Sequence, residues 1–269
     1  MKKVLFIHVP KTSGSSLKSL LRDSLGDFFI QANSSGQLER ADPLLGRVRD
    51  LEGIREVLER HSGLALHVDA SFDAQNRTTD FRSLAWHVFA PEHAAYFAQF
   101  TVLTMLREPF RRFLSEYAFV QRVKQADPGF LPDLAASSLE AYLQETHENV
   151  MLHFLLEPQL SRRRSLTRAD LARVQERILE CPIHVGIYER YDESIAYFAR
   201  LLGRGFAARD VPSHNRGGEP PVHDAALQAA FYARNGLDVE LYDFALRLLD
   251  QRLAEAGVLP RAVSGSAQA

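Results

Sequence analysis

The chain has 269 residues, of which 46% are hydrophobic, and a formal net charge of -2 at pH 7. This length and hydrophobic share predict a substantial core, and the near-neutral charge argues against a nucleic-acid-binding surface, so any anion site must be local. The single cysteine, Cys181, excludes a disulfide framework within the chain and a CxxC metal site. It suits a reducing compartment, and we expect a cytoplasmic protein.

The N-terminus has Lys2 and Lys3, but its apolar run ends at Pro10 and lacks a small-residue cleavage site, so no signal peptide is expected. No apolar run in the sequence reaches the length that spans a membrane. We expect one domain over residues 1–259 and a disordered tail over residues 260–269.

The first informative stretch is VLFIHVPKTSGSSLKSLL, residues 4–21. Its apolar run breaks at Pro10 into a cluster of lysine, glycine and hydroxyl residues, and leucines then recur at helical spacing. This pattern predicts a buried strand, a phosphate-sized turn and a helix. Helix-start N–H groups, the helix dipole, hydroxyl donors and one ammonium together suit a phosphate or a sulfate.

Two more strand-to-helix switches follow in the sequence. Residues 101–106 are a β-branched apolar run, and an amphipathic helix follows over residues 109–124. CPIHVGIY, residues 181–188, predicts another strand, followed by a helix over residues 192–202 that ends at Gly203. Strands alternating with helices predict an α/β fold with a mostly parallel central sheet, whose ligands bind at the carboxyl ends of the strands.

Shorter patterns predict the remaining elements, and polar segments such as residues 31–49 are expected to be loops. The helix over residues 109–124 is expected to bury Phe110, Phe113, Leu114, Tyr117 and Val120. A further strand is expected over residues 64–68, and a short strand or a loop over 84–89. Further helices are expected over 51–61, from Pro91, after a capping box of Ser137 and Glu140, from Thr167 with Asp170 to Leu179, and over 225–234 and 239–256.

The first turn is not the common nucleotide-binding loop GxxxxGK[ST], because Lys11 precedes Gly14. HVPKTSGSSL resembles the phosphosulfate-binding loop of sulfotransferases that use 3'-phosphoadenosine 5'-phosphosulfate (PAPS), especially the carbohydrate 2-O-sulfotransferase branch, which often has HxPKTGGTS. Ser13 replaces the first glycine of that pattern, so we expect unstrained backbone there. The resemblance implies a P-loop-like three-layer fold with helices flanking the sheet. It also implies that the nucleotide is bound by Lys11, Thr12, Ser13, Gly14, Ser15 and Ser16.

A second motif strengthens the resemblance. LTMLREPFRRFLSEY is similar to the family's 3'-phosphate motif, in which an arginine ends a strand and a serine follows eight positions later; these are Arg107 and Ser115. An arginine at a strand end can donate two hydrogen bonds to a phosphate, and a serine in the second turn of the helix can face the same crevice. His214, Asn215 and Arg216 resemble a late loop that folds over the nucleotide, so Arg216 is a further candidate for the 3'-phosphate.

Sulfuryl transfer needs an acceptor for the hydroxyl proton and positive charge at the leaving oxygen. His87 matches the histidine that acts as base in the similar carbohydrate 2-O-sulfotransferases, while His67 and His93 are rivals and His8 lies in the expected buried strand. Lys11 would stabilise the leaving oxygen. This scheme requires no metal.

The sequence therefore favours a PAPS-dependent sulfotransferase that acts on a hydroxyl of a glycan or glycoconjugate. Two alternatives remain: a P-loop-like kinase, and a non-catalytic binder of a nucleotide or a sulfated glycan. Asp69 could hold a metal in the kinase alternative, but an aspartate in a turn is the simpler interpretation. The run of arginines at 162–164 is either a solvated loop or a contact for an acidic glycan. No pattern indicates the acceptor position or the oligomeric state.

Overall fold

A central parallel sheet organises the computed structural model. The model describes residues 3–25, 29–32, 65–69, 94–98, 100–126, 138–156, 165–203 and 224–258. Within these ranges the sheet has five strands in the order β2-β3-β1-β4-β5, and every neighbouring pair is parallel. The strands are β1 (Lys3–His8), β2 (Phe29–Ala32), β3 (Ala65–Asp69), β4 (Phe100–Leu106) and β5 (Ile183–Ile187).

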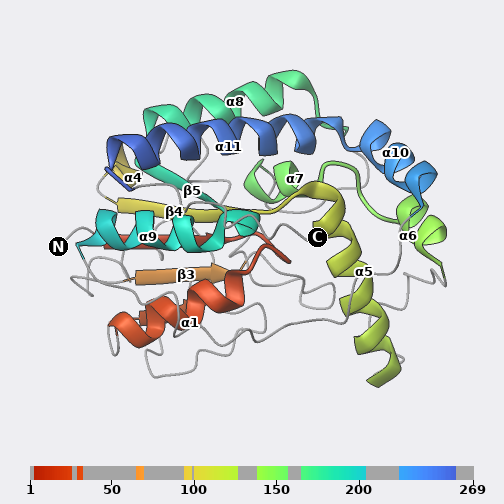
Figure 1. Cartoon of the computed structure of the whole chain (residues 1–269), viewed down its shortest axis with the longest axis horizontal. Coiled ribbons are helices and arrows are strands. Elements are labelled where there is room, and N and C mark those ends of the chain that lie inside the picture. Colours follow the sequence, from red (N-terminus) through yellow and green to blue (C-terminus); the bar gives the residue numbers. More distant parts are fainter. Residues whose placement is uncertain are drawn as a thin grey trace, which may run out of the picture.

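Helices cover both faces of the sheet (Figure 1). One face is covered by α1 (Gly14–Leu25) and α9 (Tyr191–Leu202). The other is covered by α7 (Val150–Leu156), α8 (Arg168–Glu180) and α11 (Gly236–Glu255), which pack on one another. The result is a three-layer α/β fold around a parallel sheet, which confirms the expected fold class.

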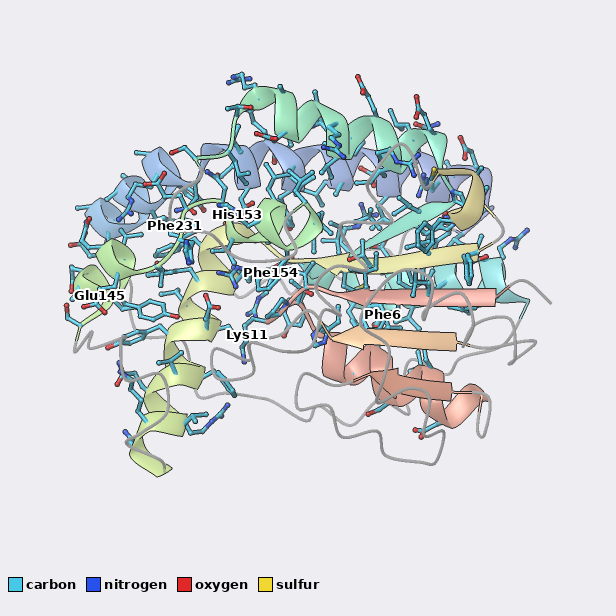
Figure 2. The ribbon with its side chains drawn as sticks, turned by 180° about the vertical axis from the view of Figure 1, so that it is seen from behind. Phe6, Lys11, Glu145, His153, Phe154 and Phe231 are labelled. Carbon is cyan, nitrogen blue, oxygen red and sulfur yellow. The ribbon has the colours of Figure 1, made fainter. Side chains whose placement is uncertain are left out.

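A second, smaller apolar cluster lies beyond the carboxyl end of β4. It joins α5 (Pro109–Ala126), α6 (Leu139–Glu145) and α10 (Ala225–Arg234). Phe231 of α10, labelled in Figure 2, lies 5.4 Å from Phe110 of α5 between ring centroids. The predicted inner face of α5 is therefore confirmed, but it packs on two neighbouring helices rather than on the sheet. The residues of α5 in this cluster are Phe110, Phe113, Leu114 and Val120, with Tyr117 packed against them.

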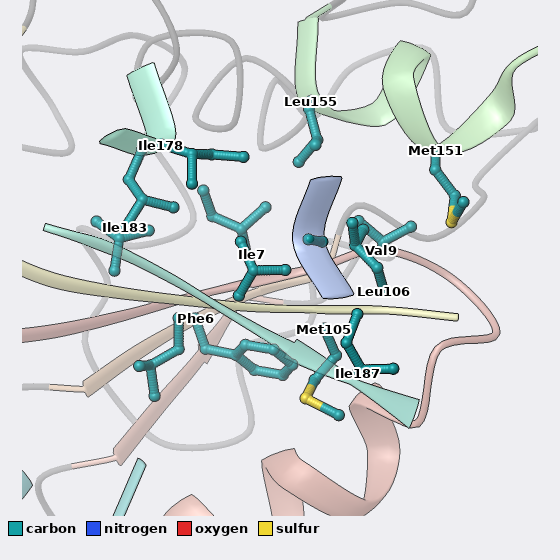
Figure 3. Packing of buried hydrophobic residues seen from close by; sticks show 14 of the residues in the cluster. Phe6, Ile7, Val9, Met105, Leu106, Met151, Leu155, Ile178, Ile183 and Ile187 are labelled. Carbon is teal, nitrogen blue, oxygen red and sulfur yellow. The ribbon is translucent and has the colours of Figure 1, made fainter. Parts of the chain in front are cut away.

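The main core follows from a sheet that is covered on both sides. Successive side chains of a strand point to opposite faces, and Figure 3 accordingly shows Phe6 on one side of the sheet and Ile7 on the other. At β5, a Cβ added to Gly186 would lie 2.4 Å from Sδ of Met105 and 2.9 Å from the ring of Phe198 in α9. Glycine at this position therefore allows α9 to approach the sheet closely.

Several local predictions are confirmed. Thr167 and Asp170 form the expected capping box at the start of α8, with the backbone N–H of Thr167 donating to the Asp170 carboxylate over 2.9 Å. Gly203 ends α9 in the left-handed conformation, with φ of 62°. Asp69 is the last residue of β3 rather than a turn residue, which corrects the simpler interpretation above.

Other predictions need correction or remain outside the described residues. The α6 helix is capped by Ser138, whose hydroxyl accepts from the backbone of Ala141, and not by Ser137. Neither β2 nor α7 was expected. Among the described helices, none combines the length and apolar character needed to cross a bilayer. The helix expected over 51–61, the strand over 84–89 and the arginines at 162–164 lie outside the described ranges.

Candidate functional site

The site begins where β1 and β4 end side by side. From β1 the sheet extends to β3 and β2 on one side, and from β4 it extends to β5 on the other. In a parallel sheet, the carboxyl ends at such a change of direction flank a crevice that binds ligands. The buried hydroxyl of Thr104 donates to the carbonyl of Ile7 over 2.9 Å, which links the two strands near their carboxyl ends. The two strand-to-helix joints found in the sequence therefore meet at this edge.

The first joint, residues 9–13, has an unusual backbone. Lys11 and Ser13 have φ angles of 67° and 73°, in the left-handed region that favours glycine. The expectation of unstrained backbone at Ser13 is therefore wrong, because a serine adopts here the conformation that the glycine of the family pattern would adopt without a steric penalty. Thr12, fully buried between them, donates its hydroxyl to the carbonyl of Val9 over 2.7 Å and thereby stabilises the turn.

This backbone leads directly into α1. The carbonyl of Ser13 accepts from the N–H groups of Ser16 and Leu17, over 3.1 and 3.2 Å. The N–H groups that precede Ser16 at the start of α1 have no acceptor within the helix, and the first turn of α1 contains no acidic residue. Because the helix dipole also places partial positive charge here, the joint suits an anion. The side chain of Ser15 is outside the described part of the structure.

Lys11 points from the first joint toward α5. Figure 2 shows it between the sheet edge and that helix, and its Nζ lies 4.3 Å from the centroid of the Phe119 ring. The pKa of Lys11 is lowered to about 8, chiefly by burial and also by the charges of Arg122, Arg107 and Arg112, while Glu116 opposes these effects. A bound anion would favour the charged form of this lysine.

One face of α5 is turned toward the first joint. Arg112, Ser115, Phe119 and Arg122 recur at intervals of three or four residues and so share a face of the helix. The contact between Phe119 and Lys11 shows that this face is directed at the loop. Ser115, in the second turn and half-buried, therefore lies on the side of α5 that faces the crevice.

Positive charge predominates around this crevice. Arg112 is 3% exposed and donates to Glu116 over 2.8 Å. Burial alone would lower the pKa of Arg112, but its ion pair and hydrogen bond with Glu116 raise it. This pairing occupies the carboxylate of Glu116, whereas Lys11 and Arg122 contact the same aromatic ring without an ion pair in the described part of the chain. An anionic ligand would relieve their mutual repulsion.

Arg107 supplies positive charge from the second joint. Its Nη1 donates to the carbonyl of Lys11 over 3.3 Å, and its guanidinium carbon lies 4.3 Å above the ring of Tyr188. Burial lowers the pKa of Arg107, although the nearby Tyr188 and Glu189 oppose this effect. The hydrogen bond to Lys11 joins the two halves of the site directly.

The residue after Arg107 fixes the start of α5. The Glu108 carboxylate accepts from the backbone N–H groups of Phe110 and Arg111, over 3.0 and 2.8 Å, and also from the hydroxyl of Tyr232 over 3.0 Å. It therefore caps the helix that presents Ser115. This cap fixes the direction in which α5 leaves β4.

The structure thus brings together the first loop, Arg107 and the face of α5 that contains Ser115. His8 is buried in β1 and stacks on Phe6 with ring centroids 5.7 Å apart, which confirms that it lies in a buried strand. His87, His93 and Arg216 lie outside the described residues, and of His67 only the backbone, in β3, is described.

Sequence reasoning missed several contributors to this site. Phe119 and Arg122 share the helical spacing of Ser115, which could have identified them. Tyr188 and Glu189 follow β5, whose carboxyl end lies next to that of β4, but only the strand order reveals that proximity. Two cationic groups on adjacent joints can bind a ligand with two separated anionic groups.

Comparisons with known proteins complete this description. The model of the family described as Sulfotransferase family matches residues 1–245. Among solved structures, the crystal structure of mouse sulfotransferase SULT7A1 complexed with PAP matches with a TM-score of 0.44 and 10% sequence identity, covering 97% of this chain and 86% of that chain. A search of curated proteins found no match.

Proposed function

The chain belongs to the sulfotransferase family, and on this premise we propose that it transfers the sulfuryl group of PAPS to a hydroxyl acceptor by in-line displacement. The observation that best supports this proposal is the hydrogen bond between Arg107 and the carbonyl of Lys11. It links the guanidinium at the joint after β4 to the backbone of the joint after β1, which also carries the ammonium of Lys11. PAPS has phosphate groups at the 3' and 5' positions of its ribose, so a protein that binds it needs two cationic groups at a fixed separation.

The described residues fit the nucleotide. We assign the 5'-phosphosulfate to Lys11 and the backbone of residues 12–16, because that segment combines helix-start N–H groups with an ammonium. We assign the 3'-phosphate to Arg107 and Ser115, with Arg216 as a further ligand. Arg107 uses Nη1 for the carbonyl of Lys11, and its side chain is 19% exposed, so part of its guanidinium stays accessible to a phosphate.

PAPS supplies an activated sulfuryl group. The acceptor oxygen forms a bond to sulfur while the bond from sulfur to the bridging oxygen breaks, and the electron pair leaves with the 5'-phosphate of the product, 3'-phosphoadenosine 5'-phosphate (PAP). Lys11 stabilises the charge that develops on this oxygen, and the helix-start N–H groups hold the 5'-phosphate in place. The hydroxyl proton goes to a base.

We propose His87 as that base. A neutral imidazole can take the proton near neutral pH, and the surrounding sequence is similar to that of the carbohydrate 2-O-sulfotransferases. Glu116, the carboxylate whose charge raises the pKa of Lys11, is a poor alternative because it is 6% exposed and accepts a hydrogen bond from Arg112. The proposed acceptor, a hydroxyl of a glycan or glycoconjugate, rests on the same sequence similarity.

Replacing His87 by alanine tests the base assignment. We expect turnover with PAPS to fall by about 100-fold or more, while the Kd for PAP changes by less than about twofold, since the base does not contact the nucleotide phosphates. His93→Ala is the matched control and should retain turnover. Unchanged turnover in His87→Ala, or a large loss in His93→Ala alone, would contradict the assignment.

Acceptor class and reaction type are tested together. The intact protein is incubated with radiolabelled PAPS and either desulfated glycans or a panel of small alcohols and phenols. Transfer to the glycans supports the proposal, and transfer restricted to phenols contradicts the acceptor class. Magnesium-dependent ATP turnover together with indifference to PAPS would contradict sulfuryl transfer itself.

A further inference from the structure

Glu189, the second residue after β5, lies beside the proposed 3'-phosphate site with its carboxylate already engaged. Both of its oxygens lie 3.2 Å from the backbone nitrogen of Glu108, which donates to them. The hydroxyl of Tyr242, from α11, donates to Oε2 over 3.0 Å. Glu189 therefore connects β5 and α11 to the joint that follows β4.

Arg107 is held on three sides at this joint. Nη1 donates to the carbonyl of Lys11, the plane of the guanidinium lies over Tyr188, and Nε is 4.0 Å from Oε1 of Glu189. A separation of 4.0 Å is too long for a hydrogen bond, although the two charges still attract each other. The Arg107 side chain is 19% exposed, so this attraction is screened less than at an open surface.

This geometry differs from an ordinary ion pair between arginine and a carboxylate. Such a pair commonly forms two parallel hydrogen bonds and uses donors of the guanidinium. Here the hydrogen bonds from Glu108 and Tyr242 hold the carboxylate in place, at a distance where it attracts Arg107 without accepting a hydrogen bond from it. The donors of Arg107 that do not contact Lys11 stay available for a ligand.

We propose that Glu189 is a positioning residue that orients Arg107 for the 3'-phosphate and thereby gives the site its preference for a 3'-phosphorylated nucleotide. This inference rests on the proposed function. Glu189 contacts neither nucleotide nor acceptor in this scheme. Tyr242 acts one step further away by holding Glu189.

Selectivity between two nucleotides distinguishes positioning from a general structural role. Kd values are measured by calorimetry, with displacement where binding is weak, for PAP and for adenosine 5'-phosphate (AMP), which lacks the 3'-phosphate. Glu189→Gln keeps an acceptor for the Glu108 N–H but removes the charge. We expect its Kd for PAP to rise roughly tenfold and its Kd for AMP to stay within about twofold.

Two further variants complete the experiment. Tyr242→Phe removes one hydrogen bond to Glu189 and should reduce the preference for PAP by roughly twofold to threefold. If Glu189→Gln does not fold, this variant alone tests whether Glu189 orients Arg107. Glu240→Gln, on the same helix in an exposed ion pair with Arg168, should leave both Kd values unchanged. Thermal melting of each variant verifies folding.

The outcomes separate this inference from the proposed function. If the unmodified protein prefers PAP over AMP and Glu189→Gln keeps that preference, the role of Glu189 is overturned while the proposed function stands. Equal weakening of both nucleotides, or tighter binding of PAP, also overturns it. If the unmodified protein shows no preference for PAP, the proposed function fails and this inference fails with it.

Discussion

The two strand-to-helix joints that we assign to the nucleotide are shaped by different means. The first, after β1, obtains its shape from the backbone, with Lys11 and Ser13 in the left-handed region and Thr12 bonded to the carbonyl of Val9. The second, after β4, has no residue with positive φ in the described structure, and its shape depends on carboxylates. Glu108 caps the helix there, and Glu189 holds the backbone of the joint.

This difference shows where each joint is sensitive to substitution. A left-handed non-glycine residue costs on the order of 1–3 kcal/mol, so folding of the whole domain must maintain the first joint. That joint presents backbone N–H groups, and Lys11 is the side chain that we assign to the reaction. The second joint presents one side chain, Arg107, whose direction depends on neighbours from β5 and α11. Substitutions at the first joint should therefore affect turnover or stability, and those at the second should affect nucleotide selectivity.

Lys11→Met gives the largest expected effect and tests the chemical role of the first joint. Removing the ammonium should lower kcat by about 100-fold to 1000-fold, because charge on the leaving oxygen would no longer be stabilised. The preference for PAP over AMP should persist, since the second joint is intact. Lys124→Met, in the last turn of α5, is the control. A Lys11→Met enzyme with normal kcat would remove Lys11 from the mechanism.

The pH dependence of PAP binding tests the same lysine without removing it. The pKa of Lys11 in the free protein is lowered to about 8, chiefly by burial, and a bound phosphate would raise it. Above pH 8 the ammonium therefore loses its proton in the free protein but keeps it in the complex. Affinity should be constant below about pH 7 and fall roughly tenfold between about pH 8 and 9.5.

Lys11→Arg provides the comparison, since arginine stays protonated over this range. Calorimetry with PAP at a series of pH values should give a flat profile for that variant. An equally steep profile in both proteins would show that another group titrates, and it would separate Lys11 from the binding of the 5'-phosphate.

Ser13→Gly gives the smallest expected effect and tests whether the first joint is strained. Glycine adopts the observed φ of 73° without a steric penalty, so the free energy of unfolding should rise by roughly 0.5–1 kcal/mol. Urea unfolding measures this change, and nucleotide affinity should stay within about twofold. Ser16→Gly, inside α1, should instead destabilise the protein by about 0.5–1 kcal/mol. Equal effects of both substitutions would contradict the difference between the positions.

Sequence patterns predicted much of this molecule because its strands are short apolar runs and its helices have clear start and stop signals. The run that became β4, Pro109 at the start of α5, the Thr167 box and Gly203 are all local features that the structure retains. The two strand-to-helix joints were predicted for the same reason. Each consists of residues adjacent in sequence.

Features that depend on distant residues were not predictable in this way. The α7 helix is short and buried on all sides, and the Asp238 carboxylate from α11 accepts its backbone N–H groups at Met151 and Leu152, each over 2.9 Å. Glu189 likewise has no local signal for its contact with the joint after β4. The strain at Ser13 was missed because the amino-acid type gives no indication of positive φ at a serine.

The central claim is that the two joints together bind one nucleotide phosphorylated at both ends. Calorimetric titration of the intact protein with PAP and with AMP, repeated for Arg107→Ala, tests it most directly. We expect the intact protein to bind PAP at least about 100-fold more tightly than AMP, and Arg107→Ala to lose most of that difference while retaining its affinity for AMP. If the intact protein binds both nucleotides equally, or if Arg107→Ala keeps the full preference for PAP, the joints do not form the site described.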